Sequence, residues 1–378
     1  MRISLPAKRI SFEVLFFLFL LMKFEAVTIK DIAKELGLST STVSRALRDS
    51  FEISTETKRL VLSCAERLHY TPNPIALSLK EKRSRSIAVL VCEIANSFFS
   101  QVINGIESIA YDKGYNVIIS QSHESFEREV NDLQFLASRS IDGLIISVSS
   151  QTENMEHLQK LYDKGLPIVF FDRVTEEMNT HLVTVDNFDS AYKAATHLLQ
   201  NGYKKIACLT NPLHLSITKE RIAGYRKALI DHGVDINEHF IKYCKQGGID
   251  RNETEVAMEE LFALPQRPDA ILGLSDKLTT GALRFLQNKH VKVPEEMGLM
   301  GFSNEDFTEL LNPSLSIIKQ PAYEMGQTAT RLLLEVIESK RPVKEFTRKV
   351  LQTQLIIRNS SRKEAGLQQN EKIKFSSL

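Results

Sequence analysis

The stretch GLSTSTVSRALRD, which runs from Gly37 to Asp49, decides the fold of the first part of this chain. Ser39 is a typical N-cap residue, and the residues after it place three apolar side chains on one side of a short helix: Val43, Ala46 and Leu47. The other side carries polar and basic side chains: Thr40, Ser41, Ser44, Arg45 and Arg48. Such a helix either presents an ordinary solvated face or inserts that face into a negatively charged partner.

The flanking segments predict two further helices. Thr28 and Asp31 are the start signals of a helix that ends at Gly37 and carries an apolar stripe of Ile29, Ile32, Ala33 and Leu36. Ser54 caps a third helix, whose core residues are Leu60, Val61, Cys64 and Leu68. Three short helices with a tight turn between the first two predict a helix-turn-helix domain.

The polar face of the middle helix suits the major groove of DNA if the other two helices cover its apolar side. Arg45 is placed for a bidentate contact to guanine, which is worth about 1–3 kcal/mol of discrimination. Arg48 suits a phosphate contact or solvent, as do Lys30, Lys34 and Lys58. The pattern alone leaves a solvated face without function as the alternative.

The segment YTPNPIALSLKEKRSRS, residues 70–86, carries a second helix signal. Asn73 before Pro74 predicts a helix that reaches about Leu79 and is too short to be stable alone. Such a helix suits folding on a partner: paired with its copy in a dimer, it would push Leu79 between base pairs from the minor groove. We assign Ala76 and Leu79 to the DNA-contacting surface. A disordered linker in the free protein is the alternative.

These two segments resemble the DNA-binding head and hinge of the lactose-repressor family of bacterial transcription regulators. VTIKDIAKELGLSTSTVSRAL and YTPNPIALSL match in order and spacing, and the likeness continues to about Arg358. The resemblance implies that Thr40, Ser41 and Arg45 contact bases and that Leu79 intercalates. Leu77 departs from the family pattern, since many members carry arginine there.

After residue 86, strand-like apolar runs alternate with amphipathic helices. The predicted strands are SIAVLV (86–91), NVIIS (116–120), GLIIS (143–147), PIVFFD (167–172), LVTVD (182–186), KIACLT (205–210), AILGLS (270–275) and LMGFS (299–303). Helices that end before Gly114 and Gly202 separate two pairs of these runs. The alternation predicts an α/β fold, and about ten strands predict two doubly wound subdomains with parallel sheets covered on both faces.

Ligands of such sheets bind beyond the carboxyl ends of the strands, so the side chains that follow the strands are the candidates. We select Phe98, Phe99, Asp172, Arg173, Asn187, Arg221, Asp276 and Ser303, with Asp186, Ser275 and Asn304 beside them. A phenylalanine covers an apolar ring face, and the polar groups supply donors and acceptors for a multi-hydroxyl ligand. Each residue alone has a plainer explanation, because strand-end Asp and Asn often cap turns and Phe often packs in the core.

The family resemblance implies a core similar to periplasmic sugar-binding proteins, with an effector between the subdomains. In that family, the arginine of R-x-x-G, here Arg221, is a frequent effector contact, and the aromatic after the first strand often lines the site. Ser303 stands where many sugar-responsive members carry aspartate, and Ser275 replaces a frequent amide or glycine. These changes put the usual hexose or purine specificity in doubt.

Charge and motif content narrow the function classes. Residues 27–85 carry 11 Lys and Arg against 7 Asp and Glu, whereas residues 86–378 carry 33 against 38, so polyanion binding belongs to the head. The four cysteines form no C-x-x-C pair and the histidines show no ligand spacing, so we expect reduced thiols and no metal. We expect no enzyme activity and no cofactor, because G-x-G-x-x-G after the first strand, the P-loop and G-x-S-x-G are absent.

The N-terminus conflicts with this interpretation. Lys8 and Arg9 precede the apolar run VLFFLFLLM, residues 14–22, which resembles a signal peptide and is too short to span a bilayer. Either this segment exports the chain, or translation begins at Met22 and the preceding residues are not part of the protein. We favour the second explanation, because a basic DNA-binding head has little use outside the cytoplasm.

We therefore expect a cytoplasmic, dimeric transcription regulator, a repressor, whose partners are a double-stranded DNA operator, a carbohydrate-like effector and a second copy of the chain, with no membrane partner. A periplasmic or secreted solute-binding protein is the alternative, and it leaves the helix-turn-helix unexplained. The expected parts are an extension (1–26), the head (27–72), the hinge and linker (73–86), the core (87–358) and a polar tail (359–378). Within the core, residues 87–187 with 319–347 form one subdomain, and 188–316 with 348–358 form the other.

Overall fold

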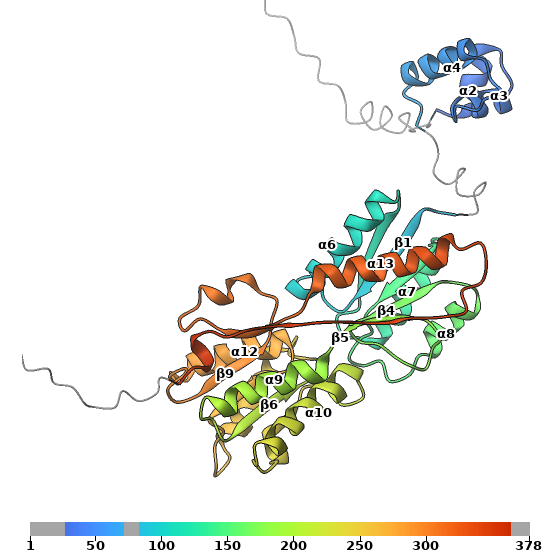
Figure 1. The fold of residues 1–378 in the computed structure, drawn as a ribbon. Coiled ribbons are helices and arrows are strands. Elements are labelled where there is room, and N and C mark those ends of the chain that lie inside the picture. The colour runs from blue at the N-terminus through green and yellow to red at the C-terminus, as the bar shows by residue number, and fades with distance from the viewer. Residues whose placement is uncertain (1–26, 72–82, 364–378) are drawn as a thin grey trace, which may run out of the picture. The chain divides into compact units, whose positions relative to one another are not determined.

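The computed structural model describes residues 27–71 and 83–363. The chain divides at Ser84 into two compact units, a small helical head and a larger α/β body (Figure 1). Ala76 and Leu79, the predicted hinge contacts, and the N-terminal apolar run lie outside the described residues. No helix within the described ranges combines the length and apolar character needed to span a membrane.

The head consists of three capped helices, as predicted. They are α2 (Ile29–Leu36), α3 (Thr40–Ala46) and α4 (Thr55–Arg67). The Asp31 carboxylate accepts hydrogen bonds from the backbone N–H and the hydroxyl of Thr28, at 2.8 and 2.7 Å, and Gly37 ends α2 with a left-handed φ of 64°. Ser39 and Ser54 cap α3 and α4 by accepting from backbone N–H groups at 3.0 and 3.2 Å.

The core of the head joins all three helices. The buried residues are Ile32, Ala33, Val43, Ala46, Val61, Cys64 and Ala65. Because the apolar side of α3 packs against α2 and α4, its polar side remains at the surface of the head.

The body contains two parallel sheets, each extended by a strand from the C-terminal part. The first has the order β11-β5-β4-β3-β1-β2 and the second β12-β10-β9-β8-β6-β7. The strands of the first sheet are β1 (Ser86–Val91), β2 (Asn116–Gln121), β3 (Gly143–Ile146), β4 (Ile168–Phe171), β5 (His181–Val185) and β11 (Arg348–Leu351). Those of the second are β6 (Ile206–Thr210), β7 (Ile241–Tyr243), β8 (Ala270–Gly273), β9 (Gly298–Phe302), β10 (Ser316–Lys319) and β12 (Gln354–Ile356).

Helices cover both faces of each sheet. Around the first sheet lie α6 (Ser97–Asp112), α7 (Phe126–Ser138), α8 (Glu156–Asp163) and α13 (Ala322–Glu338). Around the second lie α9 (Asn187–Gln200), α10 (Ser216–Asp231), α11 (Arg251–Phe262) and α12 (Asp276–Asn288), with short 3-10 turns η1 (Glu238–Phe240), η2 (Asp306–Glu309) and η3 (Asn359–Ser361). Successive side chains of β1 alternate between the two cores: Ile87 and Val89 pack with α6 and α13, and Ala88 and Leu90 pack with α7 and α8. The first sheet is therefore buried on both faces.

The chain passes between the subdomains after β5, after β10 and between β11 and β12. The predicted assignment of residues 348–358 to the second subdomain is wrong for its first part, because β11 pairs in parallel with β5, with Arg348 opposite Leu182. β12 does join the second sheet, antiparallel to β10.

The predicted polar tail also begins too early. Ser360 and Ser361 are fully buried, and the hydroxyl of Ser360 donates to the Leu299 carbonyl at 2.6 Å and accepts from the Ser316 N–H at 2.8 Å. These polar residues are fixed by hydrogen bonds rather than by apolar packing, which explains why apolar periodicity did not find them.

Candidate functional site

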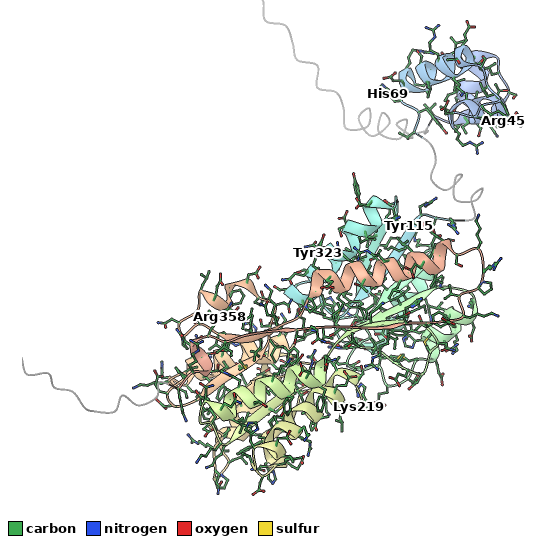
Figure 2. All side chains as sticks on the ribbon, in the orientation of Figure 1. Arg45, His69, Tyr115, Lys219, Tyr323 and Arg358 are labelled. Atoms are coloured by element: carbon green, nitrogen blue, oxygen red, sulfur yellow. The ribbon has the colours of Figure 1, made fainter. Side chains whose placement is uncertain are left out.

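The exposed face of α3 carries the side chains predicted to contact DNA. Thr40, Ser41, Arg45 and Arg48 are exposed, and Ser44 is half-buried. Arg48 donates to the carbonyl and hydroxyl of Ser44 at 3.0 and 2.8 Å. Arg45 pairs with Glu52 at 3.0 Å, and its side chain remains 54% exposed (Figure 2). Both guanidinium groups therefore lie at the surface of the head, and Glu52 is the counter-ion of Arg45.

In the body, the carboxyl ends of both sheets face one cavity between the subdomains, of about 60 Å³. Six of the eight predicted effector residues line it: Phe98, Phe99, Asp172, Arg173, Arg221 and Asp276. Asn187 and Ser303 do not line it. Asn187 is hydrogen-bonded to the lining residue Arg221, and Ser303 to the lining residue Asp276. A second cavity, of about 540 Å³, shares Arg173 with the first and extends toward Arg348.

Aromatic side chains form one wall of the first cavity. Asn96 caps α6 by accepting from the Phe98 N–H at 2.9 Å, which places Phe98 and Phe99 in the first turn. The two rings meet edge to face at 5.1 Å, and Phe99 meets Phe171 at 6.2 Å. Both phenylalanines belong to the hydrophobic core and also line the cavity.

Arg221 reaches the cavity from α10 and is held by three groups. Its guanidinium lies 3.7 Å from the centre of the Phe302 ring, its Nε donates to Asn187 Oδ1 at 2.8 Å, and its Nη1 donates to the Leu274 carbonyl at 2.6 Å. The remaining Nη2 makes no hydrogen bond among the described residues, and its nearest carboxylate is Asp172 at 3.9 Å. Burial lowers the pKa of Arg221 to about 10, so it remains a cation at neutral pH. Asn187 is therefore a positioning residue, and Nη2 is a free donor.

Asp276, the first residue of α12, presents a carboxylate to the same cavity. Its Oδ1 accepts from the Ser303 hydroxyl at 2.5 Å, and its Oδ2 accepts from Asn96 at 3.3 Å. Burial raises the pKa of Asp276 to about 6. Ser303 thus orients the carboxylate of Asp276 by donating a hydrogen bond to it.

Several lining residues escaped prediction, among them Glu93, Asn96, Glu124, Asn211 and Gln320. Glu124 follows β2 and Asn211 follows β6, so the rule that ligands bind beyond strand ends would have found both had it been applied to every strand. Gln320 follows β10, a strand that the sequence pattern did not reveal.

Polar contacts join the two subdomains across the cavity. Ser97 donates to Glu305 at 2.5 Å, Lys277 pairs with Glu93 at 3.1 Å, and Asn304 donates to Gln101 at 2.9 Å. Together with the small volume of the first cavity, these contacts describe subdomains that are closed onto each other.

Comparison with known proteins accounts for both units. Residues 28–73 match the family described as "Bacterial regulatory proteins, lacI family", and residues 84–360 match "Periplasmic binding proteins and sugar binding domain of LacI family". The transcriptional repressor PurR of Vibrio campbellii is 30% identical over 336 residues, which cover 89% of this chain and 99% of that protein. The repressor CytR of Escherichia coli K12 is 32% identical over 342 residues, which cover 89% and 97%.

Solved structures agree. The transcriptional regulator CelR in complex with cellobiose has 27% identity and a TM-score of 0.65, with 88% of this chain and 99% of that chain covered. The lac repressor dimer bound to operator and the anti-inducer ONPF has the same fold, with a TM-score of 0.74, 24% identity and coverage of 90% and 100%. The chain therefore belongs to the LacI family of bacterial transcriptional regulators, with a helix-turn-helix DNA-binding domain followed by a periplasmic-binding-protein-like effector domain.

Proposed function

We propose that the protein represses transcription in the cytoplasm by binding an operator as a homodimer, with α3 in the major groove and the segment that contains Ala76 and Leu79 in the minor groove. The observation that carries this proposal is the polar face of α3, which is exposed on a head whose three helices are capped and packed. Thr40, Ser41 and Arg45 supply base contacts, and Ser44 and Arg48 supply further polar contacts to DNA.

The test begins with selection of genomic fragments by the full chain at physiological salt. We expect a preferred duplex, and we expect Arg45→Ala to weaken binding to it by about 5- to 150-fold, since one bidentate base contact is worth about 1–3 kcal/mol. Arg59→Ala, on an exposed position of α4, is the matched control for loss of a positive charge. Leu79→Ala should abolish specific binding while the body stays folded. Absence of any preferred fragment would refute the proposal.

We further propose that the cavity between the subdomains binds a small polar effector of carbohydrate type. An aromatic wall beside a carboxylate, an amide and a guanidinium with a free N–H suits a hydroxylated ring. A relative, CelR, has been solved with cellobiose, which supports this class. The relatives are repressors rather than enzymes, and we assign no catalytic role to the cavity.

A thermal-shift screen of sugars, sugar alcohols and nucleosides tests the effector site, because a ligand of the folded state raises the melting temperature. Arg221→Ala should abolish the shift given by the best compound and leave operator binding intact. A stabilising compound whose effect survives Arg221→Ala would contradict the assignment of this cavity.

The homodimer is supported by apolar side chains that the body leaves at its surface. Tyr111 is 76% exposed and Leu310 81% exposed, and Phe307 and Tyr323 are about half exposed. Leu310 and Phe307 adjoin, since the Leu310 N–H donates to the Phe307 carbonyl at 3.0 Å, and adjoining exposed apolar groups commonly mark association surfaces. Sedimentation of the full chain should give twice the mass of one chain, and Leu310→Lys should shift the population toward the monomer.

A further inference from the structure

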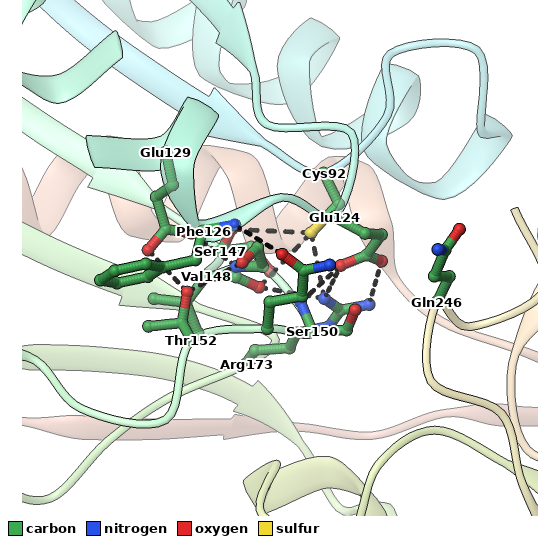
Figure 3. Close-up of polar contacts among 12 residues, drawn as sticks. Cys92, Glu124, Phe126, Glu129, Ser147, Val148, Ser150, Thr152, Arg173 and Gln246 are labelled. Carbon is green, nitrogen blue, oxygen red and sulfur yellow. Dashed lines mark hydrogen bonds and ion pairs between the residues drawn. The ribbon is translucent and has the colours of Figure 1, made fainter. Parts of the chain in front are cut away.

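Arg173 lines the first cavity, and the carboxylate of Glu124 neutralises its charge. Its Nη1 and Nη2 donate to the two carboxylate oxygens of Glu124 at 2.6 and 2.7 Å, and Nη1 also donates to the Val148 carbonyl at 3.0 Å (Figure 3). Both side chains are buried, with 4% of Glu124 and 6% of Arg173 exposed, and both line the first cavity. This is a bidentate pair, the geometry in which a carboxylate binds arginine most tightly.

The backbone around this pair is strained. His123, Glu124 and Asp172 have φ values of 50°, 59° and 57°, in the left-handed region that residues other than glycine rarely adopt. Such conformations persist where the surrounding contacts enforce them, and they gather at functional sites. Two of them, Glu124 after β2 and Asp172 directly after β4, line the cavity, and His123 precedes Glu124 in the chain.

Glu124 is ionised in this setting. Burial alone would raise the pKa of Glu124, but Arg173 and the Ser150 N–H, which donates at 2.6 Å, hold that pKa below its ordinary value. The other cations of the cavity also have carboxylate neighbours, with Lys277 at 3.1 Å from Glu93 and Arg221 at 3.9 Å from Asp172. The fourth carboxylate of the lining, that of Asp276, forms no ion pair among the described residues. The lining therefore holds one carboxylate more than it holds cations.

Resting on the effector site proposed above, we propose that Glu124 sets the charge class of the effector: by neutralising Arg173, it makes the cavity admit uncharged hydroxylated compounds and exclude those that carry a carboxylate or a phosphate. An acidic ligand would have to break the bidentate pair and then leave Glu124 buried without a cation. An uncharged ligand requires neither change.

Glu129, in the first turn of α7, provides a matched control five residues after Glu124. Its carboxylate, which is fully buried, accepts from the Ser149 N–H at 2.6 Å, the Thr152 hydroxyl at 2.8 Å and His157 at 2.8 Å. Glu124 and Glu129 therefore fix consecutive backbone N–H groups of the loop after β3, from opposite sides (Figure 3). Only Glu124 forms an ion pair with Arg173 within the described part of the chain. A purely structural role predicts the same consequences for both substitutions.

The experiment compares the full-length wild type, Glu124→Gln and Glu129→Gln. Melting temperatures are measured against inorganic phosphate, acetate and D-glucuronate, with D-glucose as the uncharged probe and chloride keeping the ionic strength constant. We expect Glu124→Gln to bind the anions about tenfold more tightly than the wild type, because it leaves a charge-assisted donor pair without a partner. Glu129→Gln should lose stability without gaining anion affinity. Equal anion affinity in all three proteins, or an equal gain in both variants, would overturn the proposal.

Arg173→Gln tests the opposite charge preference, and it keeps the proposal testable if Glu124→Gln does not fold. It leaves the Glu124 carboxylate unpaired, so D-glucosamine should bind about tenfold more tightly relative to D-glucose than it does to the wild type. An unchanged ratio would overturn the proposal. The proposed function fails separately: if no uncharged compound alters operator binding by the wild type, the effector site is refuted, whatever the anion titrations of the variants give.

Discussion

The pKa values of two carboxylates of the cavity, Glu124 and Asp276, shift in opposite directions because their neighbours differ. Arg173 and the Ser150 N–H outweigh the effect of burial on Glu124 and lower its pKa. Asp276 receives hydrogen bonds from Ser303 and Asn96 but no cation at ion-pair distance among the described residues, and burial raises its pKa to about 6 from an ordinary value of 3.8. Burial alone therefore does not decide whether a carboxylate in this cavity is charged.

Asp276→Asn should stabilise the protein at neutral pH. Because the folded state binds the proton of Asp276 more tightly than the unfolded state does, wild-type stability falls as the pH rises from about 4 to about 6 and stays reduced above that. The variant lacks this loss, so the gain should be about 1–3 kcal/mol at pH 7.5 and should vanish near pH 4. The measurement is the urea midpoint of both proteins at the two pH values.

Asp306→Asn is the control, since that side chain is 83% exposed and pairs with Lys319 at the surface. It should change the midpoint little at either pH. A lower midpoint for Asp276→Asn than for the wild type at pH 7.5 would show that the hydrogen bonds of Asp276 outweigh its desolvation.

At the scale of single elements, local rules predicted the head well. Thr28, Ser39 and Ser54 were recognised as caps because capping depends on residues within one turn. The central strands other than β10 were recognised because burial on both faces demands a continuous apolar run, as in Ile168–Phe171. These features depend on residues that are close together in the sequence, so they can be predicted from the sequence alone.

The edge strands β7, β11 and β12 did not follow the same rule. β11 has the sequence RKVL and is largely exposed, and it pairs with β5 although more than 160 residues separate them. Nothing in its local pattern specifies that partner. The site shows the same division, because strand-end positions identified Asp172 and Arg173, whereas the pairing of Arg173 with Glu124 depends on the order of strands in the sheet.

The crossing of α6 and α13 depends on glycine. A Cβ at Gly105 would lie 2.0 Å from the Tyr323 carbonyl oxygen, and one at Gly326 would lie 2.1 Å from the Val102 carbonyl oxygen. Helix propensity alone would favour Gly105→Ala by about 1 kcal/mol. We expect instead a loss of about 3 kcal/mol, because the helices must move apart.

Thermal unfolding and amide hydrogen exchange of α6 and α13 check this expectation. Ser108→Ala, one turn further along α6, is the control, since it removes only hydrogen bonds of a half-buried hydroxyl. Exchange should accelerate in both helices for Gly105→Ala and in neither for the control. A Gly105→Ala variant more stable than the wild type would mean that the close approach in the structure is not required.

At the scale of the whole body, effector control requires that the two subdomains have a closed and an open arrangement that the effector distinguishes. The structure has contacts that exist only when they are closed, such as Ser97 with Glu305 and Lys277 with Glu93. Glu305 does not line the first cavity, so its substitution changes the closure equilibrium without removing a ligand contact.

Glu305→Ala should therefore favour the open arrangement. Loss of a hydrogen bond to a carboxylate is worth about 1.5–3 kcal/mol, enough to shift the ratio of closed to open forms by tenfold or more. Small-angle scattering of the variant without effector should show a larger radius of gyration than the wild type. Any effector that binds the closed form should bind the variant more weakly, by the factor through which the closed population has fallen. Asp306→Ala removes the adjacent carboxylate, whose partner Lys319 lies in the same subdomain, and it should leave both quantities unchanged. If the two variants scatter alike, the contact between Ser97 and Glu305 does not govern closure.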